Sequence, residues 1–434
     1  MRVLLVAVLV TGSLIIPLGA IAHAQPGGQP LIIGDMSGSM RGFAEASGTA
    51  LGNLYQILVI NIPSSQLKGL RTGVEQVPQN QSRFFAAARN YGGDTDLANA
   101  IRSVRETYQQ AILVTDGMQS QDMYLGIKDE LTKMASDGWG IWLLELDLPF
   151  HGIYDTEMPV DLNTLQPGIR DCARKRDPQA QVVPKKGSQR IYDYKGNRPL
   201  LMFVFSRDPT TGRTLTEKIL SNVKSDRRFS PQVVEIAPLI HRGVEFSEPR
   251  AGDAADYIRV DGFTTGAPTI RSNMADGKRI KDLILPIVWS HEPPPLPQVF
   301  NETPNYDVAA CSWVEDEPAD EPLSTEQDPQ KVTGNVRIRF ISEVSWFRNH
   351  FCWIPRFSCS EEKSDQLNFS AASEFFPVER AWWSELSSDT SWECPNKVFK
   401  LSELVTDVAA IAVQRHQETS NQQKLSFRLV VGPL

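Results

Sequence analysis

The sequence predicts an α/β fold with a doubly wound, mostly parallel sheet for the N-terminal half of this chain. Between residues 30 and 228, uninterrupted apolar runs alternate with amphipathic segments of helical spacing. Such apolar runs are typical of strands buried on both faces, as in a parallel sheet. Alternation with helices predicts a sheet covered on both sides. The expected strands are 30–35, 111–117, 140–147 and 198–206, and the expected helices are 97–108, 120–136 and 211–225.

The C-terminal half has a different pattern, which predicts a β-rich α+β domain over residues 229–434. Short alternating stretches such as YIRVDGF and VRIRFIS are separated by proline-rich and acidic spacers. Residues 291–304 read as an extended linker or long loop, and the acidic stretch 315–328 reads as a solvated loop. Near the end of the chain, 401–413 has helical spacing and 424–431 alternates like a strand.

The chain of 434 residues is long enough for two or three domains. Residues 1–24 have a positive start, an apolar stretch and the small-x-small sequence Ala22-His23-Ala24, which predicts a cleaved signal peptide. No later apolar run is long enough to span a bilayer, so we expect an exported protein, periplasmic or extracellular, without a transmembrane segment after cleavage. The net charge of −8 argues against nucleic-acid binding.

Residues 148–197 stand out as an insertion in the predicted domain 25–228. They separate two expected strands that normally need only a short crossover, and their middle is basic. A solvated charged face explains this composition, but the segment also leaves its strand at the edge where ligands bind in such sheets. We therefore consider that it borders a partner site.

The cysteines fit an exported protein without defining a disulfide framework. Four lie in the C-terminal half, where one or two disulfides are expected, and Cys172 is expected to be a free thiol. The four are Cys311, Cys352, Cys359 and Cys394.

Oxygen-bearing side chains gather where three of the expected elements begin or end. Asp35 closes the first strand and is followed by Ser37 and Ser39, whose spacing of two allows both hydroxyls to face one point. Thr95 precedes a helix, although this position also suits a helix N-cap. Asp116 closes another strand, although Asp-Gly is also an ordinary turn signal.

Hydroxyl, carboxylate and water oxygens are the ligands that Mg²⁺ and Mn²⁺ prefer. Neutral hydroxyls leave such an ion with a demand for one more anionic oxygen, which a carboxylate of a protein partner supplies. Two further acids, Asp96 and Asp147, are candidates for a supporting role around the ion, and Asp147 is otherwise an ordinary loop residue.

The set Asp35-x-Ser37-x-Ser39, Thr95 in GGDTD and Asp116 in LVTDG resembles the metal-ion-dependent adhesion site (MIDAS) of von Willebrand factor A-type (vWA) domains. The resemblance covers residues 28–228. It implies a Rossmann-like doubly wound sheet and direct ligation of the metal by Ser37, Ser39 and Thr95. It implies that Asp35 and Asp116 hold the metal largely through water.

These observations predict a metal-binding, adhesion-type protein rather than an enzyme. No nucleophile elbow, P-loop or HExxH sequence is present. Two alternatives remain: a metal-dependent hydrolase, in which the same ion activates water, and a structural domain that keeps the motif without the metal.

Overall fold

The computed structural model describes the strands, helices and connections that position the candidate site, and part of the C-terminal half. The described residues are 29–63, 65–71, 74–77, 82–117, 121–156, 181–184, 190–237, 245–246, 258–261, 269–272, 282–290, 296–309, 314–317, 331–340, 363–378, 381–388, 397–419 and 423–431. The predicted signal peptide, the cysteines and the tip of the insertion lie outside these residues.

The N-terminal half is built on an eight-stranded mixed sheet with the order β3-β2-β1-β4-β7-β5-β8, in which β6 pairs with β7. Strand β1 is parallel to its neighbours β2 and β4. The strands are β1 (Leu31–Asp35), β2 (Gln66–Leu70), β3 (Val74–Gln76), β4 (Gln110–Thr115), β5 (Gly140–Thr156), β6 (Gln181–Pro184), β7 (Arg190–Ser206) and β8 (Pro231–Ala237).

The expectation of a mostly parallel sheet is wrong for the part beyond β4. Strands β5 and β7 form one long antiparallel hairpin, which pairs Gly140 with Ser206 and Thr156 with Arg190. Strand β7 lies between β4 and β5 and is antiparallel to both. Apolar runs indicate burial but not strand direction, so the sequence pattern did not distinguish this hairpin from a crossover. Both ends of the insertion 148–197 therefore belong to strands.

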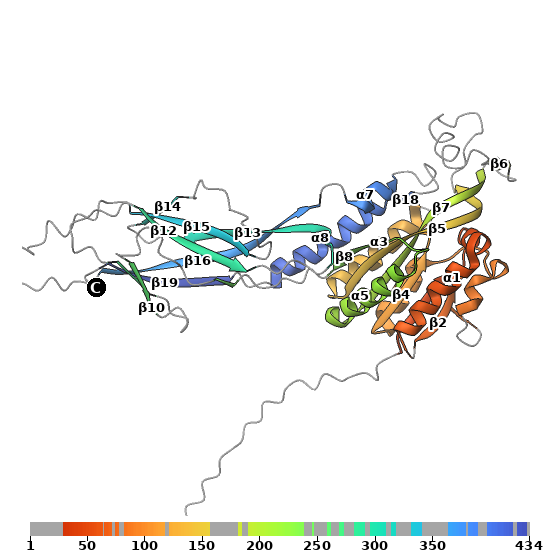
Figure 1. The fold of residues 1–434 in the computed structure, drawn as a ribbon, viewed down its shortest axis with the longest axis horizontal. Coiled ribbons are helices and arrows are strands. Elements are labelled where there is room, and N and C mark those ends of the chain that lie inside the picture. The colour runs from red at the N-terminus through yellow and green to blue at the C-terminus, as the bar shows by residue number, and fades with distance from the viewer. Residues whose placement is uncertain are drawn as a thin grey trace, which may run out of the picture.

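Helices cover both faces of the sheet (Figure 1). On one face lie α1 (Arg41–Asn61) and α5 (Pro209–Ser225), packed on Ile32, Val114 and Trp142. On the other face lie α2 (Leu97–Thr107), α3 (Gln121–Ser136) and α8 (Leu401–Thr419). The three expected helices are present, so the α/β fold class is confirmed at this level.

Local sequence accounts for several of these helix ends. Asp96 caps α2, since its carboxylate accepts a hydrogen bond from the backbone N–H of Asn99. Asp208 caps α5 in the same way, and Pro209 occupies the first helical position. Gly138 follows α3 with a φ of +83°, a conformation that glycine adopts without strain.

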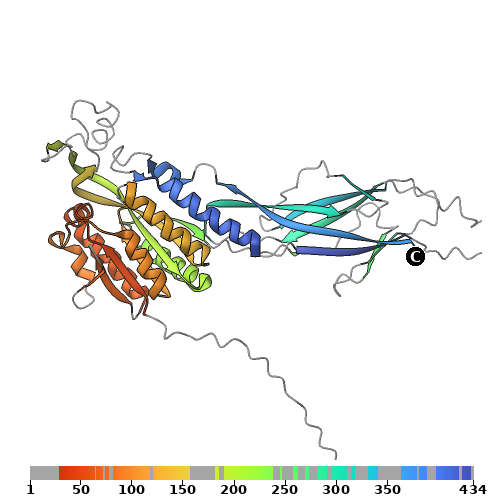
Figure 2. The same cartoon turned by 180° about the vertical axis from the view of Figure 1, so that it is seen from behind.

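The unit around this sheet extends beyond the expected boundary at residue 228. Strand β8 is part of the sheet, and α8 lies alongside α3 and buries its apolar face on the same core (Figure 2). Short elements precede α8 in the chain, namely α7 (Trp382–Leu386), β17 (Ser387–Ser388) and β18 (Val398–Phe399).

The rest of the C-terminal half forms two further sheets, which extend away from the first along the long axis of the molecule (Figures 1 and 2). One has the order β10-β11-β19-β16-β13 and the other β14-β15-β12-β9. Their strands are β9 (Glu245–Phe246), β10 (Ile258–Asp261), β11 (Thr269–Ser272), β12 (Asp282–Ser290), β13 (Phe300–Ala309), β14 (Val314–Glu317), β15 (Lys331–Phe340), β16 (Lys363–Pro377) and β19 (Gln423–Val431).

Two loop predictions in this half need correction. Strand β13 begins inside the stretch 291–304, and β14 includes the first acids of 315–328. Both strands pair along their length with a neighbour, so backbone pairing has overridden an unfavourable composition. Among the described residues, no helix is long and apolar enough to cross a membrane.

Candidate functional site

The loop after β1 gathers the first three predicted donors. The side chain of Asp35 is fully buried, and its Oδ1 accepts a 2.8 Å hydrogen bond from the backbone N–H of Ser37. The hydroxyl oxygens of Ser37 and Ser39 lie 2.9 Å apart. The predicted convergence of two hydroxyls beside the Asp35 carboxylate is therefore present in the structure.

The loop that carries Thr95 is joined to this first loop by its backbone. Gly38 donates a 3.0 Å hydrogen bond to the carbonyl of Gly93, and Gly92 donates a 2.9 Å hydrogen bond to the carbonyl of Met36. Gly93 has a φ of +84°, which a residue with a side chain rarely adopts. Thr95 is buried in the connection that leads into α2, and the paired glycines explain how this loop approaches the first one.

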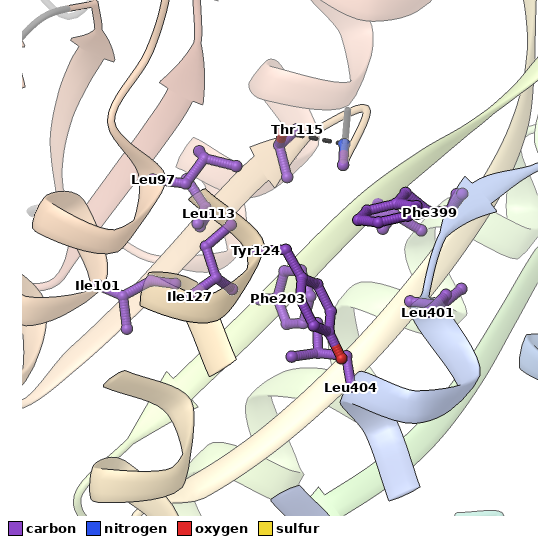
Figure 3. A pocket seen from close by; sticks show the side chains of 13 residues that line it. Leu97, Ile101, Leu113, Thr115, Tyr124, Ile127, Phe203, Phe399, Leu401 and Leu404 are labelled. Carbon is purple, nitrogen blue, oxygen red and sulfur yellow. Dashed lines mark hydrogen bonds between the residues drawn. The ribbon is translucent and has the colours of Figure 1, made fainter. Parts of the chain in front are cut away.

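Asp116 is brought to the same place by the end of β4. The hydroxyl of Thr115 donates a 2.6 Å hydrogen bond to Oδ2 of Asp35 and accepts one of 3.1 Å from the backbone N–H of Gly117 (Figure 3). The side chain of Asp116 is only 1% exposed. The carboxylates of Asp35 and Asp116 thus lie at the ends of two adjacent parallel strands.

Burial and the neighbouring charge of Asp116 raise the pKa of Asp35 to about 6. Burial is the larger cause, because it removes solvation from the charged form, and the negative charge of Asp116 adds repulsion. The hydrogen bonds from Thr115 and Ser37 act in the opposite direction and favour the carboxylate. A site that places two buried acids together in this way is electrostatically suited to a cation.

A basic side chain that the sequence did not single out faces Asp116. Arg198, near the middle of β7, is fully buried, and its Nη1 lies 3.6 Å from Oδ2 of Asp116. Its guanidinium is 4.6 Å from the ring centroid of Phe150 and 5.8 Å from that of Phe43. The only sequence signal is a charged residue at the start of the apolar run 198–206.

The absence of a side chain at Gly34 leaves room for two aromatic rings beside the end of β1. A Cβ at this position would lie 2.2 Å from Cε1 of Phe85 and 2.4 Å from the hydroxyl oxygen of Tyr55. The rings of Tyr55 and Phe85 are stacked with centroids 3.9 Å apart. This stack packs against Gly34, the residue before Asp35, so the end of β1 lies against a pair of aromatic rings.

The two acids proposed for a supporting role have other contacts. Asp96 is exposed and caps α2, as described above. Asp147 is exposed on β5 and accepts a 3.0 Å hydrogen bond from the side-chain amide of Asn197 on β7. The carboxylate of Asp35 is contacted by Thr115, and that of Asp116 faces Arg198.

The donor set fits an oxygen-preferring divalent ion. Two carboxylates and three hydroxyls are the chemistry that Mg²⁺ or Mn²⁺ accepts. Among the described residues, no group of three or more His, Cys, Asp or Glu side chains gathers where it could hold a metal. Three of the five donors of the candidate site are hydroxyls, so it does not belong to that class of metal site.

A small cavity lies between the sheet and the helices α2, α3 and α8, and Thr115 is one of its lining residues (Figure 3). It is lined almost entirely by apolar side chains, such as Leu113, Phe203 and Phe399, and encloses about 30 Å³. This volume is too small for an organic ligand, and the lining offers few polar groups. The cavity is therefore a packing feature rather than a ligand site.

Comparison with protein-family models, with curated proteins and with solved structures finds no match to this chain.

Proposed function

We propose that this chain is an exported protein that binds a protein partner through a divalent cation, Mg²⁺ or Mn²⁺. Ser37, Ser39 and Thr95 would hold the ion through their hydroxyls, and Asp35 and Asp116 largely through water. The observation that carries the proposal is the hydroxyl pair of Ser37 and Ser39, 2.9 Å apart, next to two buried carboxylates at adjacent strand ends. A bound ion would supply an electrophilic centre that accepts an anionic oxygen.

A vWA-like fold is part of the proposal. Support comes from the strand order β3-β2-β1-β4, from the parallel pairing of β1 with β2 and β4, and from helices on both faces. The site lies at the carboxyl ends of β1 and β4, where ligands bind in open α/β sheets. The antiparallel β7 between β4 and β5 is a departure from a purely doubly wound arrangement.

The partner surface would include the hairpin arm, meaning residues 148–156 of β5 and 190–197 of β7. Phe150 of this arm packs edge-on against Phe43, with ring centroids 5.1 Å apart. A Cβ at Gly42 would lie 2.3 Å from the Phe150 ring, so the arm presses on the first turn of α1. Because α1 directly follows the loop of Ser37 and Ser39, the arm borders that loop.

The chemistry favours a carboxylate as the partner group. The hydroxyls of the site are neutral, so they leave much of the ion's charge to be balanced from outside. A hydrolase would need in addition a general base within hydrogen-bonding reach of the reacting water. Asp35 accepts hydrogen bonds from Ser37 and Thr115, and Asp116 faces Arg198, which favours a holding role for both carboxylates.

Calorimetric titration with Mg²⁺ and Mn²⁺ tests the metal. We expect one binding event in the wild type and none in D35A, whereas E217Q, which changes an exposed acid on α5, should titrate like the wild type. Absence of binding in the wild type would leave the motif as a structural relic.

A second experiment tests the partner. Proteins that the immobilised wild type retains with Mg²⁺ but not with chelator should be lost with D35A. Substitution of one acidic residue in an identified partner by its amide should abolish retention. Metal-dependent turnover of a hydrolase substrate panel would contradict the proposal and favour the enzymatic alternative.

A further inference from the structure

The position of Arg198 is unusual because its charge is placed inside the protein next to the site. The side chain is fully buried, although arginine is seldom fully buried without a compensating partner. Its Nη1 lies 3.6 Å from Oδ2 of Asp116, which is itself buried. Burying a charge is costly unless an opposite charge compensates it, so each of these two side chains reduces the cost of burying the other.

The surroundings of Arg198 hold the guanidinium in this place. The residue pairs with Leu148 in the β5–β7 hairpin, which fixes its backbone. The rings of Phe150 and Phe43 lie 4.6 Å and 5.8 Å from its Cζ. Both distances are within the range of cation–π attraction. The hairpin, α1 and β4 therefore meet at this one side chain.

We infer that Arg198 is the built-in counter-cation of Asp116, and that it competes with the metal for this carboxylate. It is a positioning residue rather than a metal ligand. The inference concerns the same site as the proposed function and rests on it for the identity of the competing ion. It adds a residue outside the motif that sets both the stability of the metal-free site and its affinity for the metal.

A charge count shows the consequence. With both carboxylates ionised, Asp35 and Asp116 contribute −2 and Arg198 contributes +1, so the metal-free site has a net charge of −1. A divalent ion changes this to +1. Without Arg198 the corresponding charges are −2 and 0. Arg198 therefore weakens the attraction for the metal and strengthens the demand of the loaded site for an anionic partner oxygen.

The test compares the wild type with R198M and R198K by titration with Mg²⁺ and Mn²⁺ alone and by thermal unfolding. Methionine keeps apolar volume between the two phenylalanine rings and removes the charge. We expect R198M to melt at a lower temperature without metal, to gain more from Mg²⁺ than the wild type, and to bind Mg²⁺ about tenfold more tightly. Lysine retains the charge, so R198K should bind within about threefold of the wild type.

Arg213 offers a matched control, because it also pairs with a buried carboxylate, that of Glu235, on the α5 side of the sheet. R213M should be destabilised with no change in Mg²⁺ affinity. If R198M does not fold without metal, recovery of its circular dichroism on addition of Mg²⁺ is the corresponding readout, and failure to recover overturns the inference.

The outcomes for this inference and for the proposed function are distinguishable. Binding in the wild type with an unchanged or weaker affinity in folded R198M would overturn the role of Arg198 and leave the proposed function intact. If the wild type does not bind the metal but R198M does, the role of Arg198 is supported and the proposed function is overturned. The arginine would then suppress metal binding altogether in the native chain.

Discussion

The hydroxyl of Thr115 donates a 2.6 Å hydrogen bond to the carboxylate of Asp35, and this bond joins the ends of β1 and β4. The same hydroxyl accepts a hydrogen bond from the backbone N–H of Gly117, so it also shapes the loop after Asp116. A single side chain thus links the carboxylate of Asp35 to the loop that follows Asp116. Thr115 lies one residue before Asp116 and is not one of the five residues that match the MIDAS pattern.

Substitution of Thr115 by valine should therefore weaken the site from outside the ligand set. The change keeps the shape but removes the hydroxyl, which leaves the buried carboxylate of Asp35 without this donor. We expect a loss of about 1–3 kcal/mol in the free energy of unfolding, measured in urea. Because the Thr115 bond lowers the pKa of Asp35, its loss should also weaken Mg²⁺ binding at pH 6.

The matched control is T216V, which removes the hydroxyl of a buried threonine in α5. This hydroxyl donates a 2.9 Å hydrogen bond to the carbonyl of Gly212 in the same helix. The control should alter Mg²⁺ affinity little. Equal effects of the two substitutions on metal binding would mean that Thr115 has no special role at the site.

Glu145 should make the protein less stable as the pH rises. Burial and, secondarily, the charge of Asp147 raise its pKa to about 7 from an ordinary value of 4.5. Below pH 4.5 the residue is protonated in both the folded and the unfolded state. Between pH 4.5 and 7 the unfolded chain ionises while the folded one stays protonated, so unfolding releases a proton and stability falls. Above pH 7 the loss is complete.

Comparison with E145Q measures this contribution. The free energy of unfolding of the wild type, relative to E145Q, should fall by up to about 3 kcal/mol between pH 4.5 and pH 8. The exposed Glu217 on α5 serves as the control site, since E217Q should follow the wild type at every pH. A constant difference between wild type and E145Q over this range would refute the prediction.

The sequence predicted the candidate site and the elements best where they depend on residues close together in the chain. Ser37 and Ser39 lie two residues apart in one loop, so a local turn is enough to bring their hydroxyls together. The helices 97–108 and 211–225 were predicted from periodicity and agree closely with α2 and α5. Apolar runs likewise located β1, β4, β5 and β7.

Long-range pairing was not predictable in the same way. The direction of β7 depends on a hairpin closed through residues 157–189, and no periodic pattern in the sequence marks it. Arg198 reaches Asp116 only because β7 lies beside β4, so its role follows from a topology that the sequence does not reveal. The packing of α8 on the first sheet likewise joins segments separated by more than 150 residues.

The tip of the β5–β7 hairpin can be removed to test the partner surface. Replacement of residues 157–189 by a short Gly-Ser turn also removes β6, but it keeps Phe150 and Arg198 in place, so Mg²⁺ affinity should be retained in calorimetry. Metal-dependent capture of the partner should be lost, because the basic segment beyond the arm is gone. Capture that is unchanged in the deletion variant would show that the arm takes no part in recognition.

The buried carboxylate of Glu235 should depend on Arg213 for compensation of its charge. Nη2 of Arg213 lies 2.7 Å and 2.9 Å from the two carboxylate oxygens of Glu235. Trp142 and Gln298 donate further hydrogen bonds to the same carboxylate, at 3.1 Å and 3.2 Å. Gln298 belongs to the segment that leads into β13, so this cluster ties the first sheet to the start of the C-terminal sheets.

Removal of one partner should cost more than removal of both. R213M leaves the carboxylate of Glu235 buried without its main compensating charge, and we expect a loss of about 3–5 kcal/mol in urea unfolding. In the double variant R213M/E235L the charge is absent, and much of the loss should be recovered. A double variant that is as unstable as the sum of the two single variants would show that the two side chains contribute independently, contrary to the geometry of the pair.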